Sequence, residues 1–154
     1  MIVTYKQIVD TFTAACESNL AIKSFAEGSI SYLDAHSQNI VYPFMFLRPL
    51  SSPGLINNTR TLNFELYSLD VPKLSNESPV ELKSRTELFL YDILSYLRYG
   101  PTVSGTDLED TMDFSLSSIT PVDEGFQDRA YGWVAGISVT SEGIYNYCNF
   151  PDAP

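Results

Sequence analysis

Few residues of this 154-residue chain carry the side chains that catalysis commonly uses. The single histidine, His36, lies in the polar stretch DAHSQN. Nucleophilic catalysis would need it beside Cys16 or a serine, with a third group to orient the imidazole. No nucleophile-elbow, phosphate-loop or dinucleotide-binding pattern is present in the sequence. We therefore expect no catalytic residue and no enzymatic activity.

An acidic segment without any basic residue extends from Pro101 to Gln127. Its six carboxylates are Asp107, Glu109, Asp110, Asp113, Asp123 and Glu124. A calcium loop would need glycine where Met112 stands, and zinc would need a cluster of cysteine and histidine, so we expect no metal and no cofactor. The segment is either a solvated loop face or the lining of a passage for DNA, in which Asp107, Glu109 and Asp110 would face the channel.

Composition limits the possible partners. Nine basic residues against nineteen acidic ones give a net charge of −10, which repels nucleic acid and anionic membranes. No apolar run is long enough to cross a membrane, and we expect no membrane contact. The two cysteines, Cys16 and Cys148, lie far apart in the chain, which fits a reduced cytosolic protein rather than a disulfide framework.

Capping residues and apolar periodicity predict the elements. Thr4 and Gln7 form a capping box for a helix that ends near Asn19, and Ser78-Pro79 begins a long helix that Gly100-Pro101 ends. The predicted strands cover residues 44–50, 59–70, 112–116 and 131–139. The first of these lies between two prolines, which favours an edge or a strand terminus. Residues 20–40 form either a short strand or an irregular excursion, and residues 119–126 a connection.

The order helix, hairpin, helix, hairpin predicts an α+β fold. We expect an antiparallel or mixed sheet of about four to five strands, with two helices packed on one face. The chain forms a single domain over residues 1–154, with residues 141–154 as an extended C-terminal arm.

The last strand and the tail hold the candidate interface residues. Tyr131, Trp133, Ala135, Ile137 and Val139 share one face of the strand. The Asp128-Arg129 pair at its start is either a simple surface pair or a contact with a neighbouring subunit, and Trp133 is either a core residue or an interface contact. The tail residues Tyr145, Tyr147 and Phe150 either reach a neighbour or fold back over the sheet.

Several local stretches resemble one family of proteins. They are Tyr42-Pro43 before an apolar strand, the helix bounded by Ser78-Pro79 and Gly100, and the segments RTLNFEL at 60–66 and DRAYGW at 128–133. Over roughly residues 1–140 the chain resembles small neck and tail proteins of tailed bacteriophages. The closest likeness is to the tail-terminator or tail-completion group, which includes head-tail connector rings.

The resemblance implies a virion structural protein that forms a ring of six or twelve copies in the neck or tail. Its partners would be portal, connector or tail-tube proteins, and DNA would pass through without specific binding during ejection. Such a protein is made in the host bacterial cytoplasm. Two other functions remain open from sequence: a small enzyme that uses His36 with Cys16 or an acidic group, and a monomeric adaptor or inhibitor.

Overall fold

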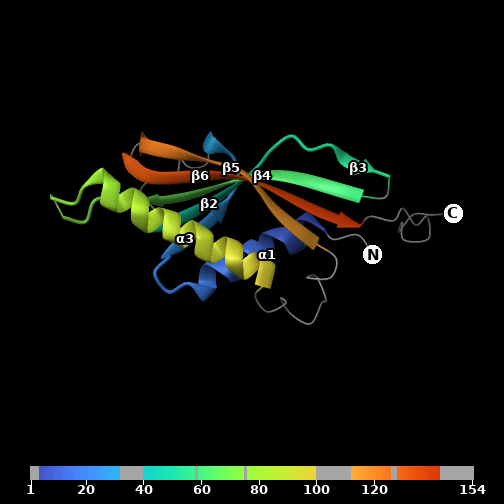
Figure 1. Ribbon diagram of the computed structural model, residues 1–154, viewed down its shortest axis with the longest axis horizontal. Coiled ribbons are helices and arrows are strands. Elements are labelled where there is room, and N and C mark those ends of the chain that lie inside the picture. The colour runs from blue at the N-terminus through green and yellow to red at the C-terminus, as the bar shows by residue number, and fades with distance from the viewer. Residues whose placement is uncertain are drawn as a thin grey trace.

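Helices α1 (Tyr5–Ser18) and α3 (Pro79–Tyr99) cover one face of a six-stranded sheet (Figure 1). The computed structural model describes residues 4–31, 40–57, 59–74, 76–99, 112–125 and 128–142. The strands are β1 (Ser24–Glu27), β2 (Phe44–Pro49), β3 (Gly54–Ile56), β4 (Thr59–Asp70), β5 (Met112–Gly125) and β6 (Ala130–Glu142). The predicted α+β class, with helices packed against a mixed sheet, is confirmed.

Both helices begin where their capping residues predict. The Thr4 hydroxyl accepts from the Gln7 backbone N–H, and Gln7 accepts in return from the Thr4 N–H, so the capping box at the start of α1 is complete. The Ser78 hydroxyl accepts from the Glu81 N–H at 3.2 Å and starts α3 in the same way. Both helix starts are therefore fixed by hydrogen bonds between residues three positions apart.

The sheet has the strand order β1-β2-β4-β6-β5, with β3 paired to the first residues of β4. Residues 24–27 form the short strand, one of the two structures predicted for this region. Among the described strands, β1 and β2 form the only parallel pair. The suggestion that β2 lies at an edge is wrong, since β1 and β4 flank it. Its prolines instead stand at the strand terminus, with Pro49 as its last residue.

The predicted end of the third strand at residue 116 is wrong. β5 continues to Gly125 through the residues expected to form a connection. The pairing with β6 shifts between Leu116 and Ser118 and again between Val122 and Gly125, which interrupts the alternation of apolar residues. Pro121 is tolerated because β5 has β6 on one side and no described strand on the other.

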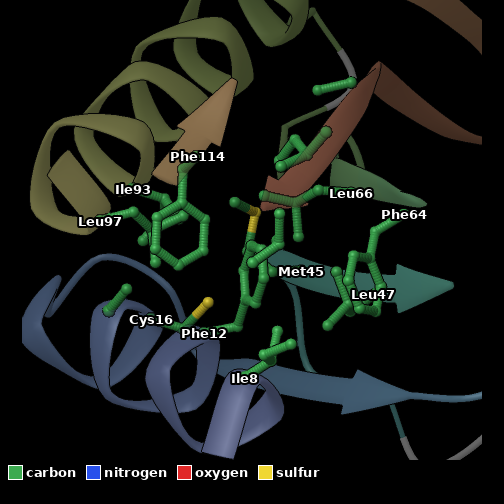
Figure 2. Close-up of a cluster of buried hydrophobic side chains, with 14 of the residues drawn as sticks. Ile8, Phe12, Cys16, Met45, Leu47, Phe64, Leu66, Ile93, Leu97 and Phe114 are labelled. Carbon is green, nitrogen blue, oxygen red and sulfur yellow. The ribbon is translucent and has the colours of Figure 1, made fainter. Parts of the chain in front are cut away.

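The main core lies between the helices and the sheet (Figure 2). Phe12 of α1 is fully buried there, with its ring centroid 5.9 Å from that of Phe64 in β4 and 5.8 Å from that of Phe114 in β5. Met45 and Leu47 of β2 complete this layer. These contacts join α1 to the strands β2, β4 and β5 and so pack the helix against the sheet.

The opposite face of the sheet is half apolar. Phe44, Phe46, Tyr67 and Leu69 form a second buried cluster, which Ile30, Ile40 and Tyr42 partly cover. Further along the same face the side chains are polar, with the Ser138 hydroxyl donating to Asn63 at 2.8 Å and the Tyr67 hydroxyl donating to Glu65 at 2.6 Å. The partly polar alternation of the strands thus corresponds to a face that the described residues cover only in part.

Gly132 provides a test of how closely β4 and β6 approach. A Cβ atom at residue 132 would lie 1.8 Å from the backbone oxygen of Ser68, whereas at Gly136 the nearest atom is the Ser117 hydroxyl, at 2.5 Å. Backbone cannot move aside without loss of strand pairing, but a hydroxyl can rotate. We expect Gly132→Ala to lower the free energy of unfolding by about 3 kcal/mol and Gly136→Ala by about 1 kcal/mol or less.

Urea denaturation followed through the fluorescence of Trp133, the only tryptophan, measures both variants. Equal midpoints for the two variants would show that the close approach of the strands at Gly132 does not constrain the sheet.

Candidate subunit interface

The residues considered for catalysis do not form a reactive site in the described part of the chain. Cys16 is buried in the main core, and this burial, together with the nearby Glu17 carboxylate, raises the pKa of its thiol to about 12. A thiol that stays protonated is a poor nucleophile, so Cys16 acts as a core residue. His36 lies outside the described residues. Within the described ranges, no three histidine, cysteine or carboxylate residues gather into a group that could hold a metal ion.

Asp128 has a partner within its own chain. Its carboxylate accepts a hydrogen bond of 2.7 Å from the hydroxyl of Tyr42, a residue 86 positions away. Burial, strengthened by this hydrogen bond, raises the pKa of Tyr42. Asp128 thus links the turn before β6 to the segment before β2. The neighbouring Arg129 is exposed at the same turn with a φ of 53°, and its side chain is available for contact with another molecule.

Trp133 lies half-buried against α3, and its indole N–H donates to the backbone oxygen of Lys83 at 2.9 Å. The ring also packs on the main core. This position matches the core role that the sequence allowed for Trp133. A further role in subunit contacts stays a prediction, as it does for Asp128 and Arg129.

The acidic segment includes part of β5. Asp123 forms a salt bridge with Lys83, and Glu124 accepts a hydrogen bond from the Tyr131 hydroxyl at 3.1 Å. Asp113 is exposed at the beginning of the strand. The three residues predicted to face a channel, Asp107, Glu109 and Asp110, lie outside the described residues, as do the tail residues Tyr145, Tyr147 and Phe150. Glu142 is still part of β6, so the strand takes up the first two residues of the predicted arm.

A buried ion-pair cluster anchors the first half of α3 to the sheet. Asp70 at the end of β4 is 0% exposed, and its carboxylate accepts from Arg85 Nε at 3.0 Å and from Nη2 at 2.7 Å. Arg85 also pairs with Glu77. Hydrogen bonds from the Lys73 N–H and from Arg85 lower the pKa of Glu77. Beside the cluster, the buried Ser68 hydroxyl donates to the Thr86 backbone oxygen at 2.8 Å.

A groove of about 390 Å³ lies between the second half of α3 and the beginning of β5. Its lining residues are Tyr91, Leu94, Ser95, Arg98, Phe114, Ser115 and Leu116. The Lys83–Asp123 salt bridge joins the other ends of the two elements, which shows that α3 runs antiparallel to β5. Tyr91 is 41% exposed and Leu116 is 42% exposed, so the groove presents large apolar groups to solvent.

Sequence reasoning missed this groove, although one signal pointed to it. Leu88 and Tyr91 lie off the apolar stripe of α3 that faces the sheet, and Leu88 is 65% exposed. Together with Ser95 and Arg98, they follow one another at the spacing of three and four residues that marks one side of a helix. This second stripe borders the edge of β5 that no described strand covers.

Comparison of the sequence with models of known protein families and with curated proteins finds no match. Among the described residues, neither α1 nor α3 has a stretch that is both long and apolar enough to cross a membrane.

The buried ion-pair cluster leads to a prediction about stability. Arg85→Met removes the cation that neutralises the fully buried Asp70 carboxylate, and we expect the free energy of unfolding to fall by about 3–5 kcal/mol. Lys6→Met breaks an ion pair whose side chains are 83% and 47% exposed, and we expect a change below about 0.5 kcal/mol. Urea denaturation at neutral pH measures both. Similar, small effects would mean that α3 does not depend on this cluster.

Proposed function

We propose that this chain is a virion structural protein, a ring-forming subunit of a phage neck or tail such as a tail terminator or head-tail connector. The observation that carries the proposal is the outer edge of β5, which no described strand covers, beside the groove between α3 and β5. Exposed apolar side chains next to an edge strand suit contact with another protein chain. The resemblance to phage neck and tail proteins gives that contact its ring geometry.

A ring contact needs two different surfaces on each subunit, because head-to-tail interfaces are heterologous. The groove between α3 and β5 supplies one surface. The candidates for the other are the exposed Arg129 beside Asp128, and the aromatic tail with Tyr145, Tyr147 and Phe150. A ring of six or twelve copies would then contact portal, connector or tail-tube proteins above and below.

The net charge of −10 supports a passage for DNA rather than a binding site for it. Like charges repel, so an acidic lining lets the phosphate backbone move without adhesion. In this proposal Asp107, Glu109 and Asp110 face the channel.

A monomeric adaptor is the second candidate, because the same groove could bind a segment of an unrelated partner. The burial of Cys16 weighs against an enzyme in which Cys16 and His36 act together.

Native mass spectrometry of the purified protein distinguishes the two leading candidates. We expect a species six or twelve times the 17.2 kDa of the subunit, and negative-stain images of closed rings with an axial opening. A strict monomer at high concentration, together with a virion reconstruction that has no ring of this protein, would exclude the ring subunit and favour the adaptor.

The acidic channel has its own test. Replacing Asp107, Glu109 and Asp110 with lysine should leave folding intact and make the protein retain DNA, with binding that weakens by roughly 0.9 log units per log unit of salt for each phosphate contacted. The matched control places three lysines at the exposed positions Glu17, Glu81 and Asp92 on the helices, with the same change in net charge. Equal DNA retention by both variants would show that the acidic segment is a solvated surface and does not line a channel.

A further inference from the structure

We propose that residues 144–150 of one copy bind in the groove between α3 and β5 of a neighbouring copy, extending its sheet along the edge of β5. The proposal rests on the ring assembly proposed above and specifies where the C-terminal arm docks.

The groove has one apolar wall on each side. Phe114 and Leu116 contribute the wall from β5, while Tyr91 and Leu94 contribute the wall from α3. Leu88, one turn before Tyr91, continues the apolar stripe toward the N-terminus of α3. From Leu88 to Arg98 the stripe is about 15 Å long, since each helical residue adds 1.5 Å. A single extended segment fits such a surface better than a globular partner does.

The edge of β5 is protected along only part of its length. Its second half carries Pro121, the charged pair Asp123 and Glu124, and an irregular pairing after Val122, all of which hinder the addition of another strand. The stretch from Phe114 to Thr120 contains no charged residue and no proline, and its one irregularity is the register shift between Leu116 and Ser118. Strand addition is therefore disfavoured beside the acidic end and permitted beside the groove.

The C-terminal tail has the matching composition. Residues 143–154 follow β6, and Ile144, Tyr145, Tyr147 and Phe150 supply four large apolar or aromatic groups within seven residues. Extended, these seven residues span roughly 20 Å, enough to cover the stripe. Asp152 is the only charged residue of the tail, and Arg98 is the only charged residue among those that line the groove. The two charges are opposite.

The topology favours the tail of a neighbour over the chain's own tail. At the end of β6, Ser141 pairs with Met112, so the tail leaves the sheet where the connection from Tyr99 enters β5. Because Met112 begins β5 at this same end of the sheet, a path of the chain's own tail to the outer edge of β5 would favour crossing of two connections at one end of the sheet, which is rare. It would also run parallel to β5, whereas a neighbour's tail is free to pair antiparallel, the more stable arrangement.

Disulfide trapping tests the contact, because the tail already contains Cys148. An affinity-tagged acceptor carries Ser115→Cys in the groove and Cys148→Ser, and the untagged donor is the natural chain. Cys16 interferes little, since its buried thiol stays protonated. The matched control acceptor carries Ser84→Cys, an exposed serine in the first half of α3, in place of Ser115→Cys. Both mixtures are oxidised with diamide and run on a non-reducing gel.

We expect at least roughly tenfold more tagged–untagged dimer with the Ser115 acceptor than with the Ser84 acceptor, because docking raises the local concentration of Cys148. Equal yields would overturn the docking. A disulfide between Ser115→Cys and Cys148 of one and the same chain would also overturn it. Such a chain runs on the gel as a monomer with increased mobility. The native mass of the natural chain separates the two proposals. If the chain forms a ring but the Ser115→Cys acceptor gives no cross-link, the ring proposal stands and the docking proposal is wrong. If the chain is a monomer and gives no cross-link, both proposals are wrong.

Discussion

The position of α3 on the sheet depends on one ion pair, in which the partly exposed Arg85 covers the fully buried carboxylate of Asp70. Apolar packing alone would let a helix slide, since one leucine fits a site nearly as well as another. The Asp70 carboxylate is fully buried, and a shift of α3 by one turn would leave it without its cation, at a cost of several kcal/mol. The bonds from Ser68 to Thr86 and from Trp133 to Lys83 fix the same register.

That register determines what the protein presents to its surroundings. With the first half of α3 held at the end of β4, its second half lies beside the beginning of β5. Leu88 and Tyr91 then face outward over an edge strand instead of over the core. The groove is therefore a consequence of the ion pair between Asp70 and Arg85, and residues outside the groove set the conformation of the proposed contact surface.

Local signals in the sequence were sufficient for some elements and not for others. The capping residues Thr4 and Ser78 act within one helical turn, so both helix starts could be predicted. The continuation of β5 beyond Leu116 could not, because a bulge reverses which face each residue occupies. The partner of Asp128 was equally hidden: Tyr42 is remote in sequence, and no pattern of charges near Asp128 indicates it. The features that could not be predicted from the sequence are therefore contacts between residues far apart in the chain.

An edge strand whose stretch from Phe114 to Thr120 carries no charge requires a physical explanation in a strongly acidic protein. Net charge keeps like molecules apart at distances up to the Debye length, about 8 Å at physiological ionic strength, but it does not block an edge once two chains meet. Proteins usually block such edges with charge or proline, and β5 carries such residues at Asp113 and beyond Thr120. The stretch between them lies beside apolar side chains, and no described strand pairs with its outer side. In the proposed assembly this stretch pairs with a neighbouring chain, and the net charge of −10 disfavours non-specific association of the same edge.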